Sequence, residues 1–138
     1  MATVTTFVVN KPLTESLSSK LVKTQSIIDC AVTALTSGDT VQVLEIPAHS
    51  LVLMVGWEVL TAKGSAGTGE LGDGSDADGW DSSINMNSAA GGNSAAGTDA
   101  YGIGKYYVAE DTIDFHPAQN NSTGKIVFCA IYATIKTA

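Results

Sequence analysis

The stretch Ser50–Thr61, SLVLMVGWEVLT, decides the fold class, because every second position along it is apolar. The alternating residues are Leu51, Leu53, Val55, Trp57 and Val59. Successive side chains of a β-strand point to opposite faces, so this spacing predicts a strand with these five side chains in a core. The preceding segment, Thr40–Ile46, is rich in β-forming residues and is closed by Pro47, which predicts a second strand.

The C-terminal third repeats this pattern. Lys105–Val108 predicts a short strand, and Thr112–His116 predicts another in which Ile113 and Phe115 point inward. Gly124–Lys136 predicts a long last strand that is apolar on both faces. One face carries Val127, Cys129, Ile131, Ala133 and Ile135, and the other carries Ile126, Phe128, Ala130 and Tyr132. Such a strand is buried on both faces, so its second face requires another element or another subunit.

Two further segments complete the middle of the chain. Ser26–Leu35, SIIDCAVTAL, predicts another strand. Residues 62–104 are dominated by Gly, Ser, Ala, Asn and Asp, and they predict a long small-residue loop region. Loops of this length are usually functional or interfacial.

The start of the chain has a different pattern. Leu13, Leu17 and Leu21 recur every four residues, so residues 1–25 are interpreted either as a short helix or as an extended N-terminal arm. The strands and turns that follow show no alternation with helices. We therefore expect an all-β fold, an antiparallel β-sandwich of about six to eight strands, as a single domain over residues 26–138.

The charge balance excludes several classes of partner. The chain of 138 residues has a net charge of −7, with seven lysines and no arginine. Nucleic acids and anionic membranes are bound through basic patches, and no such patch exists here, so neither is predicted as a partner. No apolar stretch approaches the roughly 18 residues that are needed to cross a bilayer.

The acidic segment Asp73–Asp81 is the strongest chemical feature of the sequence. Five acids and no base lie between Gly69 and Asp81. Dense carboxylates in a glycine-rich loop can wrap a calcium ion, but no Glu closes a twelve-residue loop of the EF-hand type. The alternative is a polar turn whose Asp side chains bond their own backbone. We favour the turn, and we predict no metal or other cofactor.

No constellation for catalysis is visible, so an enzyme is not predicted. His49 and His116 are the only histidines, and neither belongs to a nucleophile or metal motif. Asp114 and His116 share a strand face, which we interpret as a polar edge. Cys30 and Cys129 lie outside any CxxC or Cys/His cluster, so they are either two buried thiols or a disulfide between neighbouring strands.

Aromatic residues supply the candidate interface. Trp80 lies in the acidic segment, where it is a sugar-stacking platform, an anchor at a subunit contact, or a lid over one end of the core. The same choice applies to the tyrosines between the glycine-rich region and the next strand. The predicted interface residues are Trp80, Tyr101, Tyr106, Phe128 and Tyr132.

A series of turn and strand-start motifs carries a family resemblance over residues 37–136. The motifs are SGDT at 37–40, EIPA at 45–48, VLMVGWEV at 52–59, LGDGSDADGW at 71–80, YGIGKYY at 101–107 and DTID at 111–114. In these motifs the chain resembles small tailed-phage virion structural proteins of the jelly-roll-like capsid decoration, or cement, type. The first 35 residues lie outside the resemblance.

This resemblance implies a role as well as a fold. It implies a protein that binds and stabilises the assembled shell as a homo-oligomer, a trimer, with the major capsid protein as its partner. The implied location is the capsid surface of the virion, after assembly in the cytoplasm of the host bacterium. The alternative is a knob domain of a head fibre or tail fibre that binds host glycans, with Trp80 and Tyr101 as the stacking residues.

Overall fold

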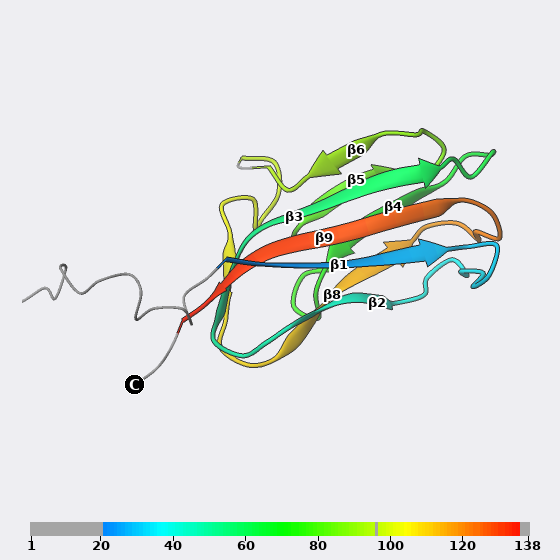
Figure 1. The fold of residues 1–138 in the computed structure, drawn as a ribbon. Helices are drawn as coiled ribbons and strands as arrows, with labels where there is room; N and C mark the ends of the chain where they lie inside the picture. The colour runs from blue at the N-terminus through cyan, green and yellow to red at the C-terminus, as the bar shows by residue number, and fades with distance from the viewer. Residues whose placement is uncertain (1–20, 96, 136–138) are drawn as a thin grey trace, which may run out of the picture.

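Two antiparallel sheets packed face to face make up the structure (Figure 1). The computed structural model describes residues 21–95 and 97–135, so most of the predicted N-terminal arm lies outside the described residues. The strands of the described part are β1 (Leu21–Asp29), β2 (Val41–Ile46), β3 (Ser50–Thr61), β4 (Thr68–Gly72), β5 (Asp81–Asn85), β6 (Gly91–Asn93), β7 (Lys105–Tyr107), β8 (Asp111–Pro117) and β9 (Lys125–Thr134).

The strand order confirms the predicted jelly-roll-like β-sandwich. The larger sheet has the order β1-β9-β3-β6, and β7 pairs with the first residues of β3. The smaller sheet has the order β2-β8-β4-β5. The chain passes repeatedly from one sheet to the other. In addition, β1 and β9, the first and last described strands, are neighbours in the larger sheet, as in a jelly roll (Figure 1). Within the described ranges, no helix is long and apolar enough to span a membrane.

β3 has the predicted bounds but not the predicted inward face. Val55 and Val59 are buried as expected, whereas Leu53 is 40% exposed and Leu51 is only half-buried. The pairing of β3 with β9 shifts register at Leu53, which is a β-bulge. A bulge inserts one extra residue and reverses the alternation, so Val52 replaces Leu51 in the core on one side of it. The prediction is therefore wrong for Leu51 and Leu53.

β9 faces the core with only one of its two apolar faces. The even-numbered residues of the strand are buried between the sheets, and the odd-numbered residues are half-buried on the outside. The buried set is Ile126, Phe128, Ala130 and Tyr132. The second apolar face is therefore left uncovered by the described part of the chain.

Residues 62–104 contain three strands, β4, β5 and β6, so the prediction of one long loop region is wrong. The small residues serve as packing positions for aromatic rings. A Cβ on Gly69 would lie 2.2 Å from the ring of Phe115, and one on Gly92 would lie 2.7 Å from the ring of Trp57. Sparse apolar residues of this region complete the core, namely Leu71, Trp80, Ile84 and Met86.

The first strand lies earlier in the chain than the sequence predicts. β1 pairs with β9 from Leu21 onward and ends at Asp29, so the strand predicted at Ser26–Leu35 is wrong in its second half. The carbonyl of Asp29 accepts hydrogen bonds from the backbone N–H groups of Val32 and Thr33, at 3.0 and 2.9 Å. These bonds close a turn, which ends the strand.

Candidate functional site

The outer face of the larger sheet, which points away from the smaller sheet, is largely apolar. Because the even-numbered residues of β9 face the core, its odd-numbered residues and their cross-strand partners point outward. Three successive rows, read from β1 across β9 to β3, are Leu21, Ala133 and Leu51; Lys23, Ile131 and Met54; and Gln25, Cys129 and Gly56. Lys23 is the one charged side chain among these nine residues, and the next row consists of Ile27, Val127 and Glu58.

The exposed apolar side chains concentrate at one end of this outer face, where β1 begins and β9 ends. Tyr106 of β7 extends the first row, because it pairs with Leu51. Ile103 is 85% exposed beside it, and Val108 and Ile135 are bonded through their backbones to His49. The exposed apolar residues at this end are Leu21, Leu53, Met54, Ile103, Tyr106, Val108 and Ile135. Exposed apolar side chains grouped at one end of a sheet are candidates for an interaction surface.

The outer face of the smaller sheet is polar and acidic. Its outward side chains include the cross-strand pairs Glu45 with Thr112 and Glu70 with His116. Both glutamates are exposed. The two flat sides of the sandwich therefore differ in chemistry, with one mainly apolar and the other polar and acidic.

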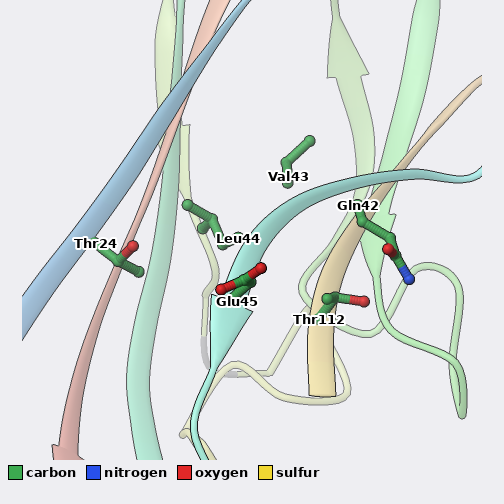
Figure 2. Close-up of a pocket in the computed structure, with 6 residues that line it drawn as sticks. All are labelled: Thr24, Gln42, Val43, Leu44, Glu45 and Thr112. Atoms are coloured by element: carbon green, nitrogen blue, oxygen red, sulfur yellow. The ribbon is translucent and has the colours of Figure 1, made fainter. Parts of the chain in front are cut away.

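A shallow polar cleft separates β1 and β2, the edge strands of the two sheets (Figure 2). Its volume is about 370 Å³, and its lining contains one carboxylate, that of Glu45. Among the described residues, one hydrogen bond crosses the cleft, from the Ser26 hydroxyl to the Val43 carbonyl at 2.5 Å. The lining residues are Thr24, Gln42, Val43, Leu44, Glu45 and Thr112. One carboxylate offers no pair for acid–base chemistry, so this cleft has the character of a gap between edges.

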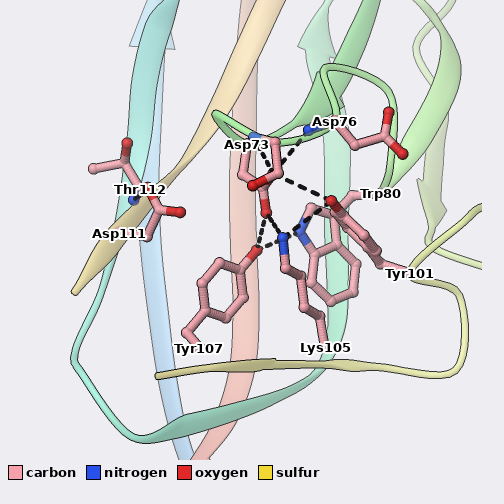
Figure 3. A network of polar contacts seen from close by, with 9 residues as sticks. Asp73, Asp76, Trp80, Tyr101, Lys105, Tyr107, Asp111 and Thr112 are labelled. Atoms are coloured by element: carbon pink, nitrogen blue, oxygen red, sulfur yellow. Dashed lines mark hydrogen bonds and ion pairs between the residues drawn. The ribbon is translucent and has the colours of Figure 1, made fainter. Parts of the chain in front are cut away.

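A second polar feature, the Asp73 network, lies between the β4–β5 turn and β7 (Figure 3). Asp73 is 3% exposed and forms an ion pair with Lys105. Its carboxylate also accepts a hydrogen bond from the Tyr107 hydroxyl at 2.8 Å and one from the Tyr101 hydroxyl at 3.3 Å. The indole N–H of Trp80 donates to the Tyr107 oxygen at 3.1 Å. One buried carboxylate thus fixes residues that are up to 34 positions away in the sequence.

The electrostatics of this network keep both charges in place. Burial opposes ionisation of Asp73, but hydrogen bonds from Lys105, Tyr107 and the Ser75 N–H outweigh it and hold the pKa of the carboxyl below its usual value. Burial also disfavours the Lys105 cation, but Asp73 and Tyr101 raise its pKa above the usual value. Burial beside Asp73 raises the pKa of Tyr107, so this hydroxyl remains a donor.

The polar-turn interpretation of the acidic segment is confirmed. The Asp73 carboxylate accepts the backbone N–H groups of Ser75 and Asp76 at 2.9 and 3.1 Å, which is the geometry of an Asx turn. Its second oxygen is bound to Lys105 and Tyr107. No cluster of three or more His, Cys, Asp or Glu side chains suited to a metal occurs within residues 21–95 and 97–135.

Sequence reasoning missed the Asp73–Lys105 pair because 32 residues separate the partners. One signal was available: Lys105 is the only cation between residues 64 and 124, a region that holds nine acids. A lone cation in such a region is the natural partner of whichever acid becomes buried.

Three of the predicted interface residues lie in the core. Trp80 and Phe128 are both 0% exposed, and Tyr132 is 9% exposed. Trp80 therefore covers the interior, as the lid interpretation predicts. The two other interpretations, an anchor at a subunit contact and a sugar-stacking platform, are wrong for this residue. Phe128 packs against Phe115, with ring centroids 5.2 Å apart. These side chains present almost no surface to a partner.

Tyr101 and Tyr106 lie nearer the surface, and their role at an interface stays a prediction. Tyr101 is half-buried, with its ring in a T-shaped contact with Trp80 and its hydroxyl near Asp73. Tyr106 is 39% exposed on the apolar outer face, with its hydroxyl 3.3 Å from His49 Nδ1.

The remaining candidates for chemistry are dispersed. Asp114 lies on the same strand face as Thr112 and His116, as predicted, but it is only 6% exposed. Burial raises the pKa of its carboxyl, which accepts a hydrogen bond from the Thr112 hydroxyl at 2.7 Å. His116 instead lies 3.5 Å from the Thr40 hydroxyl. Cys30 and Cys129 are both free thiols, which answers the question of a disulfide between them.

Comparison with known proteins finds the same fold in three phage capsids. No family model matches the chain, and no curated protein matches it. A chain in the acidic stable capsid structure of Helicobacter pylori bacteriophage KHP30 aligns with a TM-score of 0.61 at 12% identity, over 83% of this chain and 88% of that chain. A chain in the capsid of Ralstonia phage GP4 has a TM-score of 0.61 at 14% identity, over 86% of both chains.

The third similar structure belongs to the capsid asymmetric unit of cyanophage Pam1. It aligns with a TM-score of 0.61 at 17% identity, over 84% of each chain. At these identities the likeness concerns the fold. The chain therefore shares a jelly-roll-like β-sandwich, nearly over its full length, with chains of phage capsid structures.

Proposed function

We propose that this protein is a structural component of a bacteriophage capsid, and more specifically a decoration protein that binds and stabilises the assembled shell. The observation that carries the proposal is the combination of this fold, shared with chains in three phage capsid structures, and a sandwich with one apolar side. The role is structural rather than catalytic. Its partner is the major capsid protein, its location is the capsid surface of the virion, and its assembly takes place in the host cytoplasm.

The two-sided chemistry of the sandwich supports this orientation. The apolar outer face of the larger sheet gains most when a protein surface covers it, because apolar area removed from water stabilises by roughly 25 cal/mol per Å². The acidic outer face of the smaller sheet is suited to remain in solvent. We infer that the protein lies on the shell with the larger sheet inward, as a homo-oligomer. The trimeric state implied by the family resemblance remains a prediction.

The glycan-binding alternative loses its main support. A sugar-stacking platform requires an aromatic face that is open to solvent, and Trp80 is fully buried. The Tyr101 ring is engaged by the Lys105 ammonium group, which lies 4.1 Å from its centroid. The structure offers no exposed pair of these two rings.

Cosedimentation tests the proposal. Capsids are assembled from the major capsid protein of the genome that encodes this chain, and the purified protein is added before sedimentation. We expect saturable binding with a fixed number of copies per capsid, and an increase in the temperature at which the shell disassembles. A protein that stays in the supernatant at all concentrations, or that occurs only in purified tails, contradicts the proposal.

A further inference from the structure

The free edge of β1 is a strand-pairing surface. β1 ends the strand order of the larger sheet and pairs there with β9. It has nine residues, no proline and no register shift. It is longer than each of the other edge strands that the structure describes, β2, β5, β6 and β7. A long regular edge is a template for another strand, because it presents a row of backbone donors and acceptors.

The hydrogen bonding to β9 shows which residues form this row. The Cys30 N–H donates to the Gly124 carbonyl at 2.9 Å, which continues the register of the β1–β9 pair. Antiparallel partners alternate between hydrogen-bonded and non-hydrogen-bonded pairs, so the even-numbered residues of β1 bond to β9. The odd-numbered residues direct their N–H and C=O groups away from the sheet. Within the described residues, the part of this row that is free to pair consists of Leu21, Lys23, Gln25 and Ile27, which are all exposed. The carbonyl of the next odd-numbered residue, Asp29, is already bonded in the turn that ends the strand.

The neighbouring edge strand β2 leaves this row open. β2 belongs to the smaller sheet and is separated from β1 by the cleft (Figure 2). The side chain that bridges this cleft is that of Ser26, an even-numbered residue. No described strand forms ladder hydrogen bonds with the odd-numbered residues. The edge is therefore accessible to an added strand within the described structure.

Along these four residues the side chains are apolar, polar, polar and apolar, so the order is the same from either end. We propose that β1 pairs antiparallel with β1 of a second copy, so that the two larger sheets become one continuous sheet across a two-fold axis. In this register Leu21 lies opposite Ile27 of the second copy, and Lys23 lies opposite Gln25. An isologous contact of this kind requires a self-complementary surface, and this row supplies one.

Competing registers are disfavoured by charge and polarity. A shift that sets Lys23 opposite itself places like charges directly across the strands, which is destabilising. A shift in the other direction sets Lys23 opposite Ile27 and Leu21 opposite Asp29. In the proposed register all four residues of each row exchange backbone hydrogen bonds, and the two apolar residues, 63% and 54% exposed in one copy, cover each other. This inference does not depend on the proposed virion role.

Disulfide trapping in the full-length protein tests the register. The background is the Cys129→Ala variant, since the remaining thiol of Cys30 is buried. Lys23→Cys and Gln25→Cys are made singly in this background, at two exposed positions. Residues in a hydrogen-bonded antiparallel pair have Cα atoms about 5.5 Å apart, within the range of a disulfide, whereas diagonal neighbours are about 7 to 8 Å apart and too distant.

We expect a covalent chain dimer on a non-reducing gel only when the two single variants are mixed and oxidised. Each variant alone is the matched control, and each should remain a single chain. A dimer formed by either variant alone, or no dimer in the mixture, overturns the proposal. The absence of a dimer in the mixture is also the result expected if another segment of the same chain covers this edge.

A proline variant tests the same contact without cysteines. Gln25→Pro removes an N–H group that points to the free edge and leaves the bonds to β9 intact, as proline on an edge strand does. We expect it to abolish the association seen by analytical ultracentrifugation while the melting temperature stays near that of Gln25→Thr, the control that keeps the N–H. Equal association of the two variants, or a chain that shows no self-association before substitution, overturns the proposal.

Discussion

Asp73 joins segments that are far apart in the chain. Its carboxylate closes the turn after β4 through two backbone N–H groups, and it holds β7 through Lys105 and Tyr107. A buried carboxylate is tolerated only when it is paired and fully hydrogen-bonded, and these contacts meet that condition. At the residue scale, this side chain positions the apolar end of the outer face, because β7 carries Tyr106.

The pKa of Asp73 predicts how stability depends on pH. The folded state holds this pKa below the value of 3.8 that is typical of an unfolded chain, so the folded state binds fewer protons. The contribution of Asp73 is therefore fully present above pH 3.8 and is lost as the pH falls through the lower folded pKa. We expect Asp73→Asn to cost about 2 kcal/mol at neutral pH, because it weakens a buried charged network.

The measurement is the melting temperature of the parent and of Asp73→Asn between pH 7 and pH 2. The gap between the two should narrow in acid, because the parent loses a contribution that the variant lacks. Glu45→Gln is the matched control, since it removes an exposed carboxylate and should follow the parent throughout. A gap that stays constant over this range contradicts the assigned role of Asp73.

At the element scale, the sequence predicted most strands but not their finer geometry. β3, β8 and β9 were predicted nearly to the residue, because alternation of apolar residues is a direct consequence of strand geometry. The bulge at Leu53 could not be predicted, because Val52 and Leu53 are both apolar and the sequence shows no break in the pattern there. The inward face of β3 was therefore assigned wrongly on one side of the bulge.

β4, β5 and β6 escaped prediction for a different physical reason. Their glycines and serines have low intrinsic β-propensity, and they form strands because large partners fill the space next to them. Gly69 lies under Phe115, and Gly92 lies under Trp57. Such pairs are contacts between distant segments, so they are visible only once the sheets are assembled. The same holds for the Asp73–Lys105 pair of the candidate site.

Gly69→Ala tests this account of β4. The added Cβ would lie 2.2 Å from the Phe115 ring, which has to move within a packed core. Overpacking of this kind costs about 1 to 3 kcal/mol, so we expect a lower free energy of unfolding in urea. Gly74→Ala is the control, because a Cβ there meets nothing within 4 Å, and its effect should stay within about 0.5 kcal/mol. Equal stability of the two variants would contradict a packing role for Gly69.

At the scale of the whole molecule, the two sheets give the sandwich two different sides. The second apolar face of β9, which the sequence predicted to need a cover, lies on the outside between β1 and β3. The opposite side presents Glu45 and Glu70. This division favours one orientation of the bound protein, in which the apolar side contacts a partner surface and the acidic side contacts solvent.

Met54→Glu tests which side meets the shell. Met54 is 37% exposed in the middle row of the apolar outer face, so a glutamate there reaches solvent in the free protein and changes its stability little. In a covered interface the same carboxylate loses its hydration without gaining a partner. We expect capsid binding in the cosedimentation experiment to weaken by at least about tenfold, which corresponds to about 1.4 kcal/mol.

Glu70→Gln on the acidic side is the matched control for this variant, and it should bind capsids as the parent does. If Glu70→Gln weakens binding and Met54→Glu does not, the smaller sheet faces the shell instead, and the apolar side has to be covered by other copies of the chain. Because both substitutions lie on strands of the same sandwich and neither enters the core, a difference between them reports the orientation of the bound protein rather than its folding.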